Sequence, residues 1–213
     1  IVSIFYHFFS GLSLMAQIKL SIIIPVLNEC ESVQRLTGEI LSAIPEEYHP
    51  FEIVFVDDGS ADGTQQLLYT LAERHTQLKY LFRNGPKSLS QSVIDGFISA
   101  TGTYIVVMDG DLQHNPAYIP DLLKACRSGS GLSIASRYME NASGFKKNTG
   151  RHYASRVATF LAVVLLKSRV SDPMTGFFAI HKDLLKQLMP RLSGVGYKIL
   201  VEIISSILIK SKS

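Results

Sequence analysis

Short apolar runs alternate with amphipathic segments along most of the chain. Five of these runs are five or six residues long, rich in β-branched residues and bounded by polar or turn-forming residues, as is typical of buried strands. The predicted strands are Leu20–Pro25, Phe51–Val56, Leu78–Phe82, Tyr104–Met108 and Leu132–Ser136.

Between the predicted strands, apolar residues recur at the spacing of a helix face. The predicted helices are Ser32–Ile44, Thr64–Arg74, Leu89–Ala100 and Ala117–Arg127. Pro116 precedes the last of them, and proline is favoured in the first turn of a helix. Strands that alternate with helices predict an α/β fold in which right-handed crossovers build a mostly parallel sheet flanked by helices.

Acidic residues stand directly after three of the predicted strands. They are Glu29, Asp57, Asp58, Asp109 and Asp111. Ligands of parallel α/β sheets bind at the carboxyl ends of the strands, so we expect these acids to share one rim. Asp109 and Asp111 are separated by one glycine, and two neighbouring carboxylates are best explained by a cation between them. Asp62, by contrast, stands where a helix opens and is expected to support that turn.

Other motif classes fit the sequence less well. Residues 58–63 resemble the first half of an EF-hand loop, but the twelfth position is Tyr69, which cannot bind calcium through two carboxylate oxygens. The sequence has no GxGxxG after a strand, no GxxxxGK[ST], no HExxH and no GxSxG. Mg²⁺ or Mn²⁺ on carboxylates typically completes its coordination with substrate phosphates, so we predict that such an ion binds a diphosphate here.

Composition and charge narrow the class of partner. With 213 residues, of which 46% are hydrophobic, the chain can bury a full core. Its two cysteines form no CxxC pair, which suits a reducing compartment. The net charge is +3, yet residues 137–169 alone contain seven Lys or Arg and one Glu. This basic segment indicates an anionic partner, and the alternative is a solvated helix face.

Two apolar segments are too short to span a bilayer. Residues 1–14 precede Met15 and lack the basic start of a secretory signal, so we expect residues 1–18 to be an N-terminal extension and residues 19–213 to form one domain. Residues 157–166 either lie in the interfacial layer of a membrane or pack as an ordinary core helix.

Six segments together carry a family resemblance. They are PVLNE at 25–29, EIVFVDDGSADGT at 52–64, MDGDLQHNP at 108–116, SRY at 136–138, RHYAS at 151–155 and DPMTGFFAI at 172–180. They resemble the family-two inverting glycosyltransferases of GT-A fold, and within them the dolichol-phosphate (polyprenyl-phosphate) mannosyltransferase branch. The resemblance implies a GT-A domain with a C-terminal helical portion on the acceptor side, and a chain that ends before the C-terminal segments of such enzymes.

The resemblance also assigns roles to single residues. Donor-binding roles fall on Pro25, Leu27, Glu29, Phe55, Asp57, Asp109, Gly110, Asp111, Gln113 and Arg137. Asp111 and Gln113 are the implied metal ligands, and catalytic roles fall on Asp109, Asp111 and Arg137. Arg151 and Ser155 match the pair that holds the acceptor phosphate. Lys87 is a candidate phosphate contact, and residues 172–178 are expected to form a structural loop near the sugar pocket.

The expected reaction needs little more than charge neutralisation and alignment. A lipid monophosphate is largely ionised at neutral pH, so no general base is required. We therefore expect the inverting, metal-dependent transfer of a hexose, mannose from GDP-mannose, onto a polyprenyl or dolichyl phosphate. The chain would act at the cytoplasmic face of a membrane, with a membrane-anchoring subunit as a further candidate partner and no nucleic acid.

Three alternatives remain open from the sequence. The first is transfer of glucose or another sugar from a UDP donor to the same lipid. The second is a truncated domain that binds a nucleotide sugar without turnover. A third, sugar-phosphate nucleotidyl transfer, lacks its glycine-rich N-terminal loop with Arg and Lys.

Overall fold

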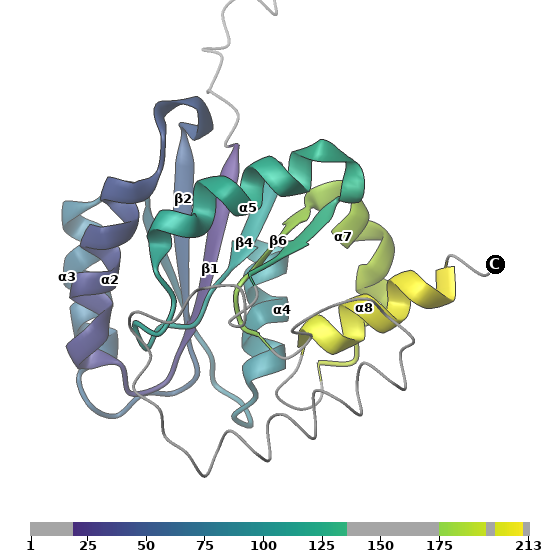
Figure 1. Cartoon of the computed structure of the whole chain (residues 1–213). Helices are drawn as coiled ribbons and strands as arrows, with labels where there is room; N and C mark the ends of the chain where they lie inside the picture. Colours follow the sequence, from purple (N-terminus) through teal and green to yellow (C-terminus); the bar gives the residue numbers. More distant parts are fainter. Residues whose placement is uncertain (1–18, 136–174, 195–198, 211–213) are drawn as a thin grey trace, which may run out of the picture.

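The computed structural model describes residues 19–135, 175–194 and 199–210 (Figure 1). Within these residues six strands form one sheet in the order β3-β2-β1-β4-β6-β5. The strands are β1 (Leu20–Val26), β2 (Phe51–Asp57), β3 (Leu78–Phe82), β4 (Tyr104–Val107), β5 (Leu132–Ile134) and β6 (Phe178–His181). The five predicted strands are therefore present, with ends shifted by at most two residues.

One strand, β6, was not predicted, and it runs against the others. It pairs antiparallel with both β4 and β5, whereas β1, β2, β3 and β4 pair in parallel. Residues 172–178 were expected to form mainly a loop. Of the described ones, 175–177 lie outside any helix or strand, and Phe178 begins this strand. Three apolar residues and a histidine directly before a helix form too short a run to distinguish a strand from a loop.

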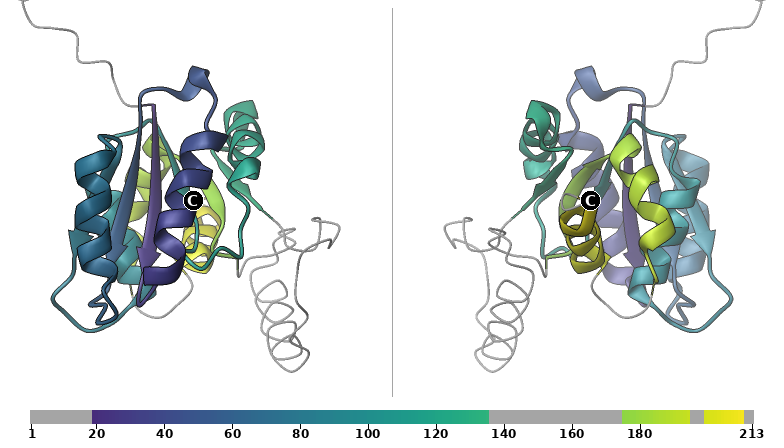
Figure 2. Two further views of the ribbon diagram at one scale, coloured as in Figure 1. Left: turned by 90° about the vertical axis from the view of Figure 1, so that its left-hand side faces the viewer. Right: turned by 90° about the vertical axis from the view of Figure 1, so that its right-hand side faces the viewer.

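Helices cover both faces of the sheet (Figure 2). One face packs against α2 (Cys30–Ala43), α3 (Thr64–Arg74) and α5 (Ile119–Ala125). The other packs against α4 (Leu89–Ser99), α7 (Lys182–Leu188) and α8 (Ile199–Lys210). The predicted helix Ala117–Arg127 is divided into η2 (Pro116–Tyr118), α5 and η3 (Cys126–Ser130). Two further short helical turns are η1 (Glu46–Tyr48) and η4 (Met189–Arg191).

The core lies on both sides of β1. All seven residues of this strand are buried, which is expected of a central strand covered on both faces. Ile22 and Ile24 pack on the side of α2, and Ile23 packs on the side of α4. A Cβ added at Gly96 of α4 would overlap the side chain of Ile23, so this glycine lets the helix approach the strand closely.

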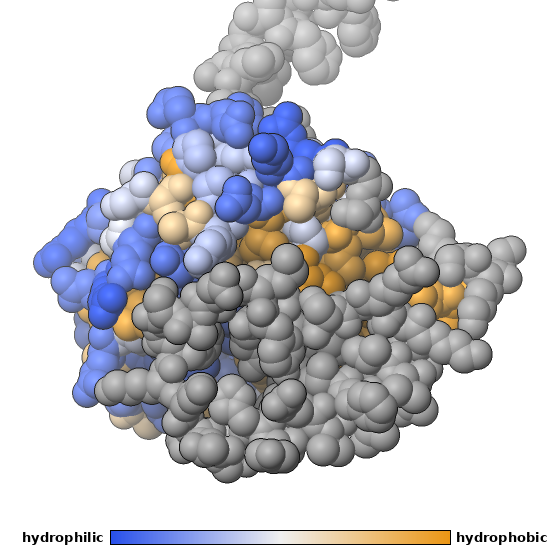
Figure 3. Space-filling view, viewed as in Figure 1, coloured by the Kyte–Doolittle hydropathy of each residue, from blue (hydrophilic) through white to orange (hydrophobic). Residues whose placement is uncertain are grey.

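The described surface differs from one side of the molecule to the other. In Figure 3, hydrophilic residues cover the side formed by α2, α3 and η1, and hydrophobic residues gather below α5 and towards α8. Ile98 of α4 and Ile209 of α8 expose 71% and 62% of their surface. Within the described ranges, no helix combines the length and apolarity needed to cross a bilayer.

A buried acid holds the sheet together at the end where β1 and β2 begin. Glu52 is 1% exposed, and its Oε2 accepts a hydrogen bond from Lys79 Nζ at 2.6 Å. Its Oε1 accepts hydrogen bonds from Ser21 Oγ at 2.5 Å and from Thr101 N at 2.7 Å. Burial alone would raise the pKa of Glu52, but the hydrogen bonds from Lys79, Ser21 and Thr101 together bring it below its ordinary value of 4.5.

Glu52→Gln tests this network. Because the pKa of Glu52 is lower in the folded chain than in the unfolded one, its ionised form stabilises the fold above pH 4.5, and that contribution is lost as pH falls through the folded-state pKa. We expect the substitution to lower the free energy of unfolding by about 1–3 kcal/mol at pH 7, and the difference to shrink in acid. Urea unfolding at several pH values measures it.

Glu39→Gln is the matched control for Glu52→Gln. Glu39 is 38% exposed and forms an i,i+4 pair with Arg35, so its loss should change the unfolding free energy by less than about 0.5 kcal/mol. The two pH values to compare are pH 7, well above the ordinary pKa of a glutamate, and pH 3.5, roughly one unit below it. If Glu52→Gln lowered the free energy of unfolding equally at both, the ionised form of Glu52 would not be the source of the stabilisation.

Candidate functional site

The carboxyl ends of three neighbouring strands form one rim of the sheet. β1 lies between β2 and β4 and is parallel to both, so the residues that follow the three strands meet at the same edge. Val26 is in register with Asp57. A Cβ added at Gly110 would lie 2.7 Å from Val26 Cγ1, so the backbone after β4 lies directly against the end of β1.

Hydrogen bonds join the loops after β1 and β2. Asn28 N donates to Ser60 Oγ at 2.8 Å, and Ala61 N donates to Asn28 Oδ1 at 2.9 Å. Asn28 has φ +57°, a left-handed conformation that asparagine tolerates better than most residues. Glu29 N donates to Thr64 Oγ1 at 2.9 Å. The two loops therefore form one hydrogen-bonded unit on the rim.

Asp62 stabilises this unit, as expected. Its Oδ1 accepts hydrogen bonds from Thr64 N at 3.0 Å and Thr64 Oγ1 at 2.5 Å, and its Oδ2 accepts one from Cys30 N at 3.0 Å. The hydrogen bond from the Thr64 hydroxyl is the largest of the effects that lower the pKa of Asp62. Both oxygens of this carboxylate are therefore occupied within the turn.

Asp57 carries a buried oxygen that has no hydrogen-bond partner in the described part of the chain. The residue is 0% exposed, and its Oδ1 accepts hydrogen bonds from Gly59 N, Ser60 N and Gln65 Nε2 at 3.1, 3.1 and 2.6 Å. Its Oδ2 is the unpartnered atom. Leaving a buried acceptor unpaired costs free energy, so Oδ2 is a candidate to accept an N–H from a bound molecule.

Asp58, the neighbour of Asp57, was expected to belong to the rim of acids, but its carboxylate is occupied by contacts within the protein. It is 7% exposed and forms an ion pair with Arg83, while its Oδ2 accepts a hydrogen bond from Ser88 N at 2.7 Å. Arg83 also pairs with Asp95 at 2.7 Å. The charge of Asp58 is thus balanced by that of Arg83. Because Asp58 also accepts the hydrogen bond from Ser88 N, it holds the loop that carries the exposed Lys87.

The remaining predicted donor residues of β1 and β2 differ in exposure. Leu27 is 38% exposed on the rim, whereas Phe55 is 0% exposed in the core beneath it, and Pro25 is also buried. Glu29 is partly exposed and its Oε2 accepts a hydrogen bond from Ser32 Oγ at 2.5 Å. Leu27 and Glu29 are therefore the two of these side chains that an incoming molecule could reach directly.

The loop after β4 presents polar side chains from a constrained backbone. Leu112 has φ +61° and packs against the core, in a left-handed conformation that costs a residue with a Cβ about 1–2 kcal/mol. Asp111 and Gln113 on either side of it are exposed, and Gln113 N donates to Asp111 Oδ1 at 3.1 Å. The side chain of Asp109 is 36% exposed. Three oxygen-bearing side chains thus remain accessible on this loop.

These side chains suit a hard divalent cation that is completed by substrate oxygens. Within the described residues, no three His, Cys, Asp or Glu side chains form a group that could hold a metal ion alone. Carboxylate and amide oxygens from Asp109, Asp111 and Gln113 are the ligand type that Mg²⁺ and Mn²⁺ prefer, and Mg²⁺ commonly takes one or two carboxylates plus phosphates. The donor set therefore fits the predicted ion when it binds together with a diphosphate.

The sequence did not indicate two residues that lie against Asp109, Gly176 before β6 and His114 in the loop after β4. Because β6 is antiparallel to β4, with Phe178 in register with Val107, the residues before β6 lie at the rim. A Cβ added at Gly176 would overlap the carboxylate of Asp109. His114 is 5% exposed, and its Nε2 lies 3.3 Å from Asp109 Oδ2. The only sequence signal was the position of this histidine directly after DLQ.

The predicted residues Arg137, Arg151 and Ser155 lie outside the described residues. The described chain ends at Ala135, whose N donates to Phe177 O at 3.0 Å. It resumes at Thr175, whose Oγ1 accepts a hydrogen bond from Phe177 N at 3.2 Å. The described residues that flank these three in the chain, Ala135 and Thr175, therefore lie beside the rim.

Comparison with known proteins identifies relatives over most of the chain. The family model described as Glycosyl transferase family 2 matches residues 21–189. A dolichol-phosphate mannosyltransferase of Pyrococcus furiosus is 38% identical over 188 residues, which are 87% of this chain and 52% of the relative. A dolichol-phosphate mannosyltransferase of Saccharomyces cerevisiae is 32% identical over a stretch that covers 89% of this chain and 71% of the yeast protein. The chain thus spans about half the length of the first relative.

Solved structures share the fold at lower identity. A glucosyl-3-phosphoglycerate synthase from Mycobacterium tuberculosis matches with a TM-score of 0.61 and 20% identity over 81% of this chain and 60% of that one. A mannosyltransferase from Pyrobaculum calidifontis, solved in complex with GDP-Man and Mn²⁺, matches with a TM-score of 0.57 and 20% identity over 82% of this chain and 47% of that one. The expected GT-A fold is confirmed, and the chain belongs to glycosyl transferase family 2.

Proposed function

We propose that this protein transfers mannose from GDP-mannose, with inversion and with a divalent cation, onto the phosphate of a dolichyl or polyprenyl lipid. The observation that carries the proposal is the rim itself. Accessible Asp109, Asp111 and Gln113 lie on the loop after β4, the strand next to β1, and on the other side of β1 lies Asp57, whose buried Oδ2 has no hydrogen-bond partner among the described residues. The names of the sequence relatives supply the sugar and the lipid.

The nucleotide is proposed to lie over the ends of β1 and β2. Asp57 Oδ2 is an acceptor without a hydrogen-bond partner in the described ranges, so it suits an N–H on the edge of a nucleobase. Leu27 is exposed beside it at the end of β1 and offers an apolar contact to a base or ribose. GDP is proposed because the sequence relatives are named mannosyltransferases and a mannosyltransferase of this fold was solved with GDP-Man. UDP is the alternative, since a glucosyl-3-phosphoglycerate synthase of this fold was solved with UDP-Glc.

The diphosphate is proposed to lie over the loop after β4. Asp111 and Gln113 would hold Mg²⁺ or Mn²⁺, and Asp109 would contact the sugar nucleotide. A bound cation at this position would offset the negative charge that grows on the departing nucleoside diphosphate. Arg137, two residues beyond Ala135 in the chain, is proposed to neutralise the same charge.

The acceptor is proposed to bind through Arg151 and Ser155. A phosphate oxygen that is already ionised can attack the anomeric carbon from the side opposite the diphosphate, so the protein needs to align it and not to deprotonate it. Arg151 and Ser155 stand in the chain between Ala135 and Thr175, which both lie beside the rim. Such an acceptor places the reaction at a membrane surface, proposed to be the cytoplasmic face, with residues 157–166 in its interfacial layer.

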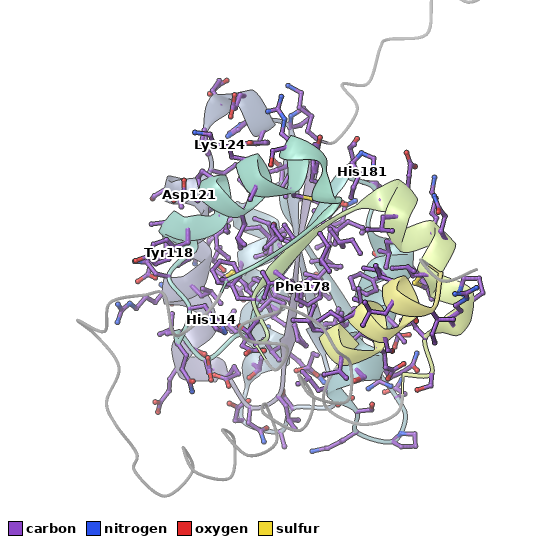
Figure 4. All side chains as sticks on the ribbon, turned by 45° about the vertical axis from the view of Figure 1, so that its right-hand side comes forward. His114, Tyr118, Asp121, Lys124, Phe178 and His181 are labelled. Atoms are coloured by element: carbon purple, nitrogen blue, oxygen red, sulfur yellow. The ribbon has the colours of Figure 1, made fainter. Side chains whose placement is uncertain are left out.

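Asp111→Asn tests the metal assignment. It replaces a charged cation ligand with a neutral one, so we expect Mn²⁺-dependent mannosyl transfer to dolichyl phosphate to fall by about 100-fold or more. The assay measures transfer of radiolabelled mannose from GDP-mannose into lipid. Asp121→Asn is the control, because Asp121 is an exposed acid on α5, away from the rim (Figure 4). Equal activity of the two variants would contradict the assignment.

Arg151→Ala tests the acceptor site. Loss of a charge-assisted contact to phosphate should raise KM for dolichyl phosphate by about 10-fold or more and leave the affinity for GDP-mannose unchanged. Steady-state kinetics at varied lipid concentration measure the first quantity, and calorimetry measures the second. Lys124→Ala removes an exposed cation from α5 and serves as the control (Figure 4). A large loss of affinity for GDP-mannose in Arg151→Ala would contradict the assignment and indicate that Arg151 binds the donor.

A screen of donors against acceptors separates the proposal from its alternatives. Membranes that contain the chain are supplied with GDP-mannose, UDP-glucose or other UDP-sugars, each with Mg²⁺ or Mn²⁺ and polyprenyl phosphate. We expect lipid-linked product from GDP-mannose alone. If product formed from a UDP-sugar instead, that sugar nucleotide would be the donor in place of GDP-mannose. Mn²⁺-dependent nucleotide binding without any lipid product would indicate a binding domain.

A further inference from the structure

We propose that His114 is a positioning residue that holds the carboxylate of Asp109 in the orientation needed to contact the sugar nucleotide. The inference rests on the proposed function, and it concerns a residue to which neither the motifs nor the comparisons assign a role. It follows from what surrounds Asp109 on its buried side.

The imidazole of His114 contacts Asp109 from inside the protein. Its Nε2 lies 3.3 Å from Asp109 Oδ2, and His114 is 5% exposed while the side chain of Asp109 is 36% exposed. One carboxylate oxygen therefore faces a buried nitrogen, and the group as a whole still reaches the surface. A buried polar contact behind an exposed functional group is how proteins commonly orient metal and substrate ligands.

Gly176 confines the same carboxylate from a second side. A Cβ at this position would overlap Oδ1, Oδ2 and Cγ of Asp109, so the backbone before β6 lies directly against the carboxylate. The absence of a side chain at Gly176 leaves the space that the carboxylate occupies. Contacts from two directions limit the rotation of Asp109 about χ1 and χ2 far more than a single contact would.

The histidine ring is itself held by the core. Its centroid lies 5.1 Å from that of Phe177, which is 0% exposed and belongs to the cluster on the α2 side of the sheet. Phe177 O accepts a hydrogen bond from Ala135 N at 3.0 Å. Through the ring contact of His114 with Phe177, the loop that carries Asp109 is thus connected to the β5–β6 pair.

The consequence for the reaction is orientational. A carboxylate that is free to rotate would meet the donor in several geometries, and small errors of placement lower the rate of transfer strongly. His114 removes that freedom before the donor arrives. Its loss should therefore reduce turnover and donor affinity without unfolding the chain.

Two substitutions separate the nitrogen of His114 from its ring. His114→Phe keeps an aromatic ring against Phe177 but loses the nitrogen beside Asp109, and His114→Gln places an amide nitrogen at a similar reach. His181→Phe is the control, because His181 also packs against an aromatic ring, that of Tyr104 at 5.2 Å, and lies at the other end of the sheet (Figure 4). The full chain is used for every variant.

Three readouts are compared in these variants. The dissociation constant of GDP-mannose with Mn²⁺ is measured by calorimetry, kcat by lipid-linked transfer, and the melting temperature by circular dichroism. We expect His114→Phe to lower kcat by about 10- to 100-fold and to weaken GDP-mannose binding, with the melting temperature nearly unchanged. His114→Gln should restore most of both losses. His181→Phe should keep the wild-type kcat and GDP-mannose affinity, and only its melting temperature should fall, because His181 Nδ1 accepts a hydrogen bond from Asp183 N at the start of α7.

The outcomes distinguish this inference from the function on which it rests. A wild-type chain that binds no GDP-mannose with Mn²⁺ overturns both. If the wild type binds and turns over, the inference alone is overturned when His114→Phe equals the wild type, or when His114→Gln is as impaired as His114→Phe. Nitrogen coupling to bound Mn²⁺ in electron paramagnetic resonance spectra would also overturn it, since His114 would then be a ligand.

Discussion

Parallel pairing of β1 with both β2 and β4 is the constraint on which the site depends. It places the carboxyl ends of three strands at one edge, although the residues concerned are about 80 positions apart in the chain. The backbone of Gly110 then closes the gap between the ends of β1 and β4. Without this arrangement, the acids after each strand would be isolated turn residues, and no ligand could contact them together.

The acids at the strand ends serve different purposes because their surroundings differ. Asp58 and Asp62 have both oxygens occupied by an arginine, backbone amides or a hydroxyl, and they stabilise loops. Asp57 has one oxygen occupied and one unpaired, while Asp111 remains exposed. A carboxylate is available for a ligand only where the fold leaves its lone pairs unused.

The sequence predicted most of the sheet and its rim but not the far side of the site. Runs of mostly apolar, β-branched residues such as Phe51–Val56 indicate buried strands without any knowledge of their neighbours. β6 is four residues long, and its direction follows from pairing with β4, which no local pattern encodes. Thus Gly176 was not associated with Asp109, since their proximity arises only from that pairing. His114 follows Asp109 in the same loop, but no spacing rule indicates that its ring turns back to the carboxylate. Asp57 and Asp58 are adjacent in sequence, and only burial and the position of Arg83 distinguish them.

The buried network around Glu52 has an implication for how such a protein can change. Glu52, in β2, contacts Ser21, Lys79 and Thr101 near the starts of β1, β3 and β4, away from the rim that follows the ends of these strands. Residues that secure the framework and residues that meet ligands thus occupy opposite poles of the same strands. An exposed rim position such as Leu27, where contact with the nucleotide is proposed, could therefore be exchanged in evolution or by engineering without loss of the framework.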